Sequence, residues 1–169
     1  MFNAIGRSMA AVAAVLLTTA VPVLGQDQED DQTFGDWQIR CDPVADGEQC
    51  ALSQWVQAEN IDGVELRAFF FEPPEDEEAL LLSVLVPLNV ILTRRLGLRI
   101  DDGELMQFDF IRCSDAGCLV SIAVDDELLT SFRQGGEALF VIYFEDDTGI
   151  GIPVSLDGLT AGLEELRGG

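Results

Sequence analysis

Polar and apolar residues alternate along much of the chain, which is the pattern of β-strands with one buried face. Near the start of this pattern, Trp37, Ile39 and Cys41 recur at every second position, and residues 119–125 alternate in the same way. Apolar runs broken by Pro, Asn, Gly and Asp indicate further strands. The expected strands lie within residues 34–42, 51–59, 64–72, 79–92, 96–104, 105–113, 119–125, 137–147 and 149–157.

Two segments show helical spacing instead. Residues 125–136 offer Asp125 or Asp126 as an N-terminal cap and Gly135 as an end. Residues 157–167 repeat leucine at helical spacing and predict a C-terminal helix. The apolar faces of the two helices consist of Leu128, Leu129, Phe132, Leu159, Leu163 and Leu166. About nine short strands and two short helices predict an all-β fold, an antiparallel β-sandwich whose topology stays open.

Three of the expected strands are apolar on both alternating faces, at residues 66–71, 80–86 and 139–144. An antiparallel sheet usually exposes one face to water, so a second layer must cover these strands. The two helices, long loops or strands that cross between sheets can supply that layer. A dimer or partner surface, or a pocket for an apolar ligand, is the alternative.

The first 25 residues have the pattern of an export signal. One charge, Arg7, precedes an apolar run, and the small residues Val23 and Gly25 stand before a cut at Gln26. A membrane anchor is the alternative, but the run is short for a span of about 20 residues and acidic residues follow it directly. We therefore expect no stable membrane span after signal cleavage.

Residues 26–33 are acidic without apolar periodicity, so we expect a flexible leader there. Residues 34–169 then form a single β-sandwich domain, which suits a mature length of 169 minus 25, or 144 residues.

The charge of the chain excludes one class of partner. It contains 31 Asp and Glu residues against nine basic residues, all Arg, with neither Lys nor His. Such a surface repels phosphate backbones, so we expect no nucleic-acid binding. Solvation outside the cytoplasm explains the acidity, and recruitment of a basic partner or of divalent cations is the alternative.

Four cysteines follow the predicted cut, and an even count in a small exported chain indicates disulfides. Opposite residues of a hairpin lie about 4.5 to 5.5 Å apart, within the range that a disulfide spans. Cys113 and Cys118 can therefore be joined across a four-residue turn, and Cys41 and Cys50 across a longer loop. The spacings do not match a zinc knuckle or a CxxC redox pair, so we expect neither a metal site nor a reactive pair.

Catalytic chemistry has little support in the composition. Ser or Cys nucleophiles generally need a nearby base, most often His, and the chain has no His and no Lys. A pair of carboxylates for glycoside hydrolysis remains, but no spacing selects one. The acidic loops at 46–48, 101–104 and 145–149 do not fit a calcium-binding loop and suit turns better. Trp37 and Trp55 could line a sugar site, but their positions favour the core. We expect no catalytic residue, no metal and no cofactor.

Four segments are similar, in order and spacing, to the invasion-associated locus B family of exported α-proteobacterial proteins. They read FGDWQIRCD at 34–42, VPLNVILTRRLGLRIDDGE at 86–104, FIRCSDAGC at 110–118 and PVSLDGLTAGLEEL at 153–166. The resemblance covers essentially the whole mature chain. Asn89, Asp157 and Leu159 depart from the family pattern, and the surface is more acidic than in relatives from pathogens.

The resemblance implies export to the periplasm or outer envelope, a role in host-cell invasion for pathogenic relatives, and no catalytic residues. We therefore expect a non-enzymatic protein that acts through contacts with an unknown envelope protein or with a second copy of itself. A small-molecule or glycan-binding module is the second hypothesis, and an envelope glycoside hydrolase that uses two carboxylates is the third.

Overall fold

The computed structural model describes residues 32–44, 47–58, 61, 63–76, 78–144 and 148–168. In these residues the strands are β1 (Gln32–Phe34), β2 (Trp37–Val44), β3 (Gly47–Gln57), β4 (Glu65–Phe71), β5 (Leu81–Val86), β6 (Leu96–Ile100), β7 (Met106–Phe108), β8 (Arg112–Ser114), β9 (Gly117–Ala123), β10 (Glu137–Tyr143) and β11 (Gly149–Ser155). The helices are α1 (Asp126–Gln134) and α2 (Leu159–Gly168), with a short 3-10 turn η1 (Leu92–Arg94). The predicted signal peptide and most of the predicted leader lie outside the described residues.

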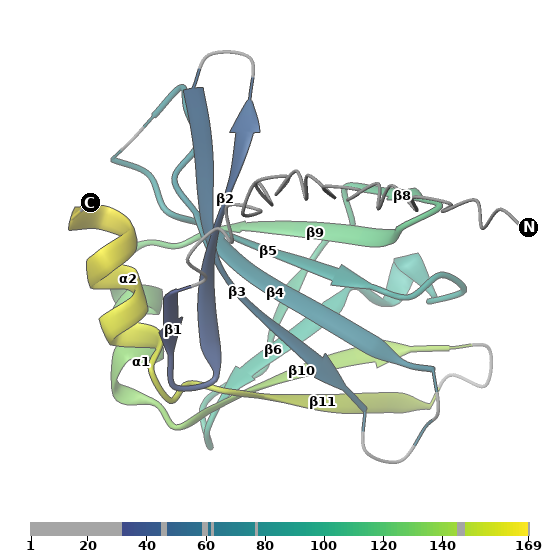
Figure 1. Cartoon of the computed structure of the whole chain (residues 1–169). Coiled ribbons are helices and arrows are strands. Elements are labelled where there is room, and N and C mark those ends of the chain that lie inside the picture. Colours follow the sequence, from purple (N-terminus) through teal and green to yellow (C-terminus); the bar gives the residue numbers. More distant parts are fainter. Residues whose placement is uncertain are drawn as a thin grey trace, which may run out of the picture.

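The strands form two antiparallel sheets (Figure 1). A seven-stranded sheet has the order β1-β2-β3-β4-β5-β9-β8, and a four-stranded sheet has the order β11-β10-β6-β7. The expected antiparallel two-sheet fold with two short helices is confirmed. No helix within the described residues is both long and apolar enough to cross a membrane.

The number of strands differs from the expected nine, because eleven are present in the described residues. The segment 105–113 was expected to be one strand, but its two ends belong to different sheets: β7 pairs with β6, and β8 pairs with β9. The predicted leader also contributes a strand, since β1 begins at Gln32 and pairs with β2. The expected loop between Cys41 and Cys50 is shorter than predicted, because β2 continues to Val44 and β3 begins at Gly47.

The core lies between the inner faces of the two sheets and follows the period of two. In β4 the inward residues Leu66, Ala68 and Phe70 are at most 1% exposed, and β10 alternates in the same way. Gln54 is one of the few buried polar side chains, and its amide exchanges two hydrogen bonds with the backbone of Ser155 in the other sheet. Trp37 Nε1 also donates to the Ser155 carbonyl, 2.9 Å away. These bonds join the two sheets at one end of the core.

The helices lie together at one end of the molecule (Figure 1), where α1 contacts α2 and α2 contacts β1, β2 and β3. Asp125 caps α1 by accepting a hydrogen bond from the Leu128 N–H at 2.8 Å, so of the two expected caps the structure selects Asp125 and not Asp126. Phe132 on α1 meets Phe70 edge to face, with ring centroids 5.3 Å apart. On α2, a Cβ at Gly162 would lie 2.5 Å from Leu52, so the small residue permits close packing. The described helices therefore cover the end of the core and not the outward side of the seven-stranded sheet.

Candidate binding surface on the outer face of the large sheet

The outward side chains of the seven-stranded sheet form the surface that we call the outer face. Cross-strand pairing aligns one row across five strands, with Trp55 opposite Arg67, Arg67 opposite Leu85, Leu85 opposite Leu119, and Leu119 opposite Arg112. The outward strand positions are Thr33, Gln38, Arg40, Asp42, Val44, Gly47, Gln49, Ala51, Ser53, Trp55, Gln57, Glu65, Arg67, Phe69, Phe71, Leu81, Ser83, Leu85, Arg112, Ser114, Gly117, Leu119, Ser121 and Ala123.

A groove of about 300 Å³ opens along the Trp55, Arg67 and Leu85 part of this row. It is lined by Trp55, Gly63, Glu65, Arg67, Leu85, Val86, Pro87 and Ala116. Most of the lining is apolar, and Glu65 is the one carboxylate among these residues. The groove therefore offers an apolar floor with one cation and one anion at its side.

Trp55 is 59% exposed at this groove, so the expectation that it belongs to the core is wrong. Trp37 is a core residue as expected, at 1% exposed. The difference follows from the strand period, because Leu52, Gln54 and Val56 point inward in β3 and Trp55 must then point outward. The sequence-based expectation placed Trp55 inward because a polar residue such as Gln54 was not expected at a buried position.

Arg67 lies over the Trp55 indole, with its guanidinium carbon 4.5 Å from the ring centroid. This cation–π contact holds the cation against the aromatic wall of the groove. Within the described part of the chain, neither Arg67 nor Arg112 forms an ion pair. The charges of these two side chains are thus available to an outside ligand.

The middle of the outer face is apolar. Phe69 and Phe71 stack with ring centroids 6.0 Å apart, and Leu81, Leu85 and Leu119 are half-buried. Ser83 and Ser121 sit among them, and their hydroxyl groups are 3.3 Å apart and hydrogen-bonded to each other. The described residues thus leave a partly exposed apolar area on the outward side of strands whose sequence is apolar on both faces.

The charge of the outer face differs from that of the whole chain. Its outward strand positions include three arginines, Arg40, Arg67 and Arg112, and two carboxylates, Asp42 and Glu65. The whole chain has a formal net charge of −22. Arginines therefore outnumber carboxylates at these positions, although the whole chain has 31 Asp and Glu residues against nine basic residues.

The second disulfide, Cys113–Cys118, closes the β8–β9 turn beside the groove. Gly117 in this turn has φ 133°, and a Cβ there would lie 2.4 Å from the Val86 carbonyl oxygen. Only glycine allows the turn to approach β5 so closely. The disulfide and the glycine together hold Ala116 in place as one wall of the groove.

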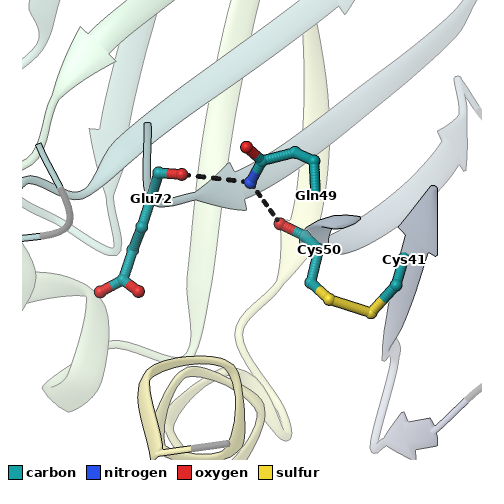
Figure 2. The surroundings of a disulfide bond; sticks show 4 residues. All are labelled: Cys41, Gln49, Cys50 and Glu72. Carbon is teal, nitrogen blue, oxygen red and sulfur yellow. Dashed lines mark hydrogen bonds between the residues drawn. A yellow bond between two sulfur atoms is a disulfide. The ribbon is translucent and has the colours of Figure 1, made fainter. Parts of the chain in front are cut away.

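The first disulfide, Cys41–Cys50, clasps the β2–β3 hairpin where it extends past the rest of the sheet (Figure 1). Figure 2 shows the Gln49 amide donating hydrogen bonds to the carbonyls of Cys50 and Glu72, both at 3.1 Å. The Glu72 carboxylate in turn pairs with Arg167 of α2 at 2.8 Å. The hairpin is thereby tied to the end of β4 and to the C-terminal helix.

Both disulfides join the pairs that hairpin geometry predicts. Glu48 lies near Cys41 and Cys50, with their possible ligand atoms all within 4.8 Å of one another. The two sulfur atoms are bonded to each other, so no thiolate remains to bind a metal ion there.

The acidic loop at 101–104 has a structural role. The Asp101 carboxylate accepts hydrogen bonds from the backbone N–H groups of Gly136 and Glu137, at 3.1 and 3.0 Å. It thereby fastens the β6 end to the start of β10. Residues 145–147 and residue 46, which complete the other two acidic loops, lie outside the described residues.

Comparisons with known proteins cover most of the chain. Residues 37–167 match the family model described as "Invasion associated locus B (IalB) protein". No curated protein sequence matches the chain. Among solved structures, the fold is similar to that of the invasion associated protein B from Bartonella henselae, with a TM-score of 0.70 and 18% identity. That match covers 82% of this chain and 95% of the other, and at this identity it bears on the fold alone.

Proposed function

Because the chain belongs to the invasion-associated locus B family, we propose that it is an exported, non-enzymatic protein of the bacterial cell envelope that acts by binding another protein. The first 25 residues have the charge and apolar pattern of an export signal, and two disulfides suit an oxidising compartment. We place the mature protein in the periplasm or against the outer envelope.

The observation that carries this proposal is the outer face. It combines an exposed Trp, half-buried Phe and Leu side chains and the side chains of Arg67 and Arg112 on one side of a sheet. Aromatic residues and Arg are enriched at the centres of protein–protein interfaces, where they contribute most of the binding energy. A rigid sheet also loses little conformational freedom when it binds.

The same surface gives little support to catalysis. Glycoside hydrolysis uses two carboxyl groups on either side of the scissile bond. Within its described lining, the groove presents the Glu65 carboxylate alone, and that carboxylate accepts a hydrogen bond from Gln57 at 3.0 Å. A groove of this kind suits binding better than acid–base chemistry.

The test is photo-cross-linking in the living cell. A photoreactive amino acid at position 55 should yield one discrete protein adduct, because this side chain faces the proposed partner. The same amino acid at position 105, an exposed leucine outside the large sheet, is the matched control and should not yield that adduct. Equal capture at both positions, or recovery of a cell-wall glycan without protein, would contradict the proposal.

A glycan-binding role is the second candidate, and Trp55 is the observation that favours it. An exposed indole beside Glu65 and Arg67 offers a stacking surface with polar groups at its edge. The cross-linking experiment separates the two candidates, because the captured species is either a protein or a glycan.

A further inference from the structure

We propose that the outer face binds an extended, acidic peptide segment of the partner, in which two carboxylates flank an apolar side chain with the order acid–x–apolar–x–acid. This inference rests on the proposed function and deepens it, because it names the chemistry of the bound segment.

Charge complementarity selects an acidic occupant. The outward strand positions include Arg40, Arg67 and Arg112 against Asp42 and Glu65, and Arg67 and Arg112 share the row that crosses the middle of the face. The unpaired guanidinium groups of Arg67 and Arg112 can each bind a carboxylate. The rest of this acidic chain repels such a segment, whereas the outer face offers it two arginine side chains in one row.

The spacing of the two arginines sets the spacing of the acids. Arg67 and Arg112 occupy one cross-strand row and are three strands apart in the order β4-β5-β9-β8. Neighbouring strands are about 4.8 Å apart, so the two positions are separated by about 14 Å. An extended peptide rises about 3.3 Å per residue, and its residues i, i+2 and i+4 share one side. Acids at i and i+4, about 13 Å apart, match the two arginines.

The central residue of the segment is apolar because of what lies between the arginines. Leu85 and Leu119 occupy the row between Arg67 and Arg112, and the groove opens beside Leu85. A volume of about 300 Å³ is at the lower limit of small-molecule pockets, so the groove admits one or two side chains of a peptide. An aromatic or branched aliphatic side chain at i+2 fits there.

Two other occupants match the outer face less well. A second copy of the chain would place the arginines of one face against those of the other, and each copy carries a net charge of −22. The acidic segment 26–31 of this chain reads QDQEDD and contains no apolar residue. It could not cover Trp55, Leu85 and Leu119.

The experiment titrates the purified, oxidised protein into a fluorescein-labelled peptide of sequence Gly-Glu-Ser-Phe-Ser-Glu-Gly and follows anisotropy. The double variant R67Q/R112Q should bind this peptide about tenfold more weakly, the combined effect of two exposed ion pairs. The matched control is R99Q, which removes an exposed arginine on the four-stranded sheet and should leave the affinity unchanged. A peptide with Lys in place of both Glu residues should not bind.

A charge exchange keeps the test decisive if neutral substitutions perturb the surface. The variant R67E/R112E should no longer bind the Glu peptide and should bind the peptide in which Lys replaces both Glu residues. No binding of the Glu peptide to the native protein, equal binding by R67Q/R112Q, or a dimer in sedimentation that R67E/R112E dissociates would each overturn the inference. Capture of a protein at position 55 together with failure of the Glu peptide would leave the proposed function standing and reject this inference.

Discussion

At the scale of single residues, Gly158 lies where two backbone segments approach each other closely. It has φ 83°, and a Cβ there would lie 2.0 Å from the Phe34 carbonyl oxygen. The neighbouring Asp157 carbonyl accepts a hydrogen bond from the Asp36 N–H at 3.2 Å. The turn that precedes α2 is therefore pressed against the β1–β2 turn, and glycine is required at this contact for both conformation and space.

We expect Gly158→Ala to lower the free energy of unfolding by about 3 kcal/mol or more, because strain at positive φ adds to a backbone clash. The matched control is Gly63→Ala. Gly63 has φ 79° but no atom within 4 Å of its would-be Cβ, so only the strain of about 1 kcal/mol remains. Urea denaturation of both variants measures the difference. Equal losses for the two variants would show that the contact at Gly158 is not tight.

At the scale of elements, the two disulfides serve different parts of the large sheet. Cys41–Cys50 clasps the part of the β2–β3 hairpin that pairs with no further strand, since β4 pairs only from Leu52 onward. Cys113–Cys118 holds the β8–β9 turn against β5, beside the groove. Both close short loops, so they contribute similar chain entropy but act on different surfaces.

We expect C41S/C50S and C113S/C118S each to lower the free energy of unfolding by about 2 to 3 kcal/mol in urea denaturation. Only C113S/C118S should also weaken binding of the Glu peptide, because without this disulfide Ala116 and the strand that carries Arg112 are held less firmly. Peptide mass mapping without reduction should find 41 linked to 50 and 113 linked to 118. Loss of peptide affinity in C41S/C50S, or a link between the two pairs, would contradict this assignment.

At the scale of the whole molecule, charge repulsion opposes the folded state. Folding brings the charges of this chain, with a formal net charge of −22 over 169 residues, closer together. Among the described acidic residues, Asp109 and Glu72 form ion pairs with arginine. The large core and the bonds of Gln54 and Trp37 to Ser155 offset this repulsion. Salt should therefore stabilise the fold by screening.

We expect the Tm in calorimetry to rise as NaCl increases from 10 to 500 mM, which shortens the screening length from about 30 Å towards a few Å. The variant E164Q/E165Q removes two exposed acids from α2 and should show a higher Tm at low salt and a smaller rise. A Tm that falls with salt in the native protein would indicate that ion pairs outweigh the repulsion.

The sequence alone was enough to determine the antiparallel two-sheet class, the two helices with Asp125 or Asp126 as the cap of the first, and the cysteine pairs. These features depend on local periods, caps and hairpin spacing, which neighbouring residues encode. Tertiary structure decided that residues 105–113 divide between two sheets and that Trp55 faces outward while Trp37 is buried. It also decided that Arg67 and Arg112 share a row with Leu85 and Leu119. Cross-strand neighbours far apart in the chain set these outcomes, and no local pattern records which strands will pair.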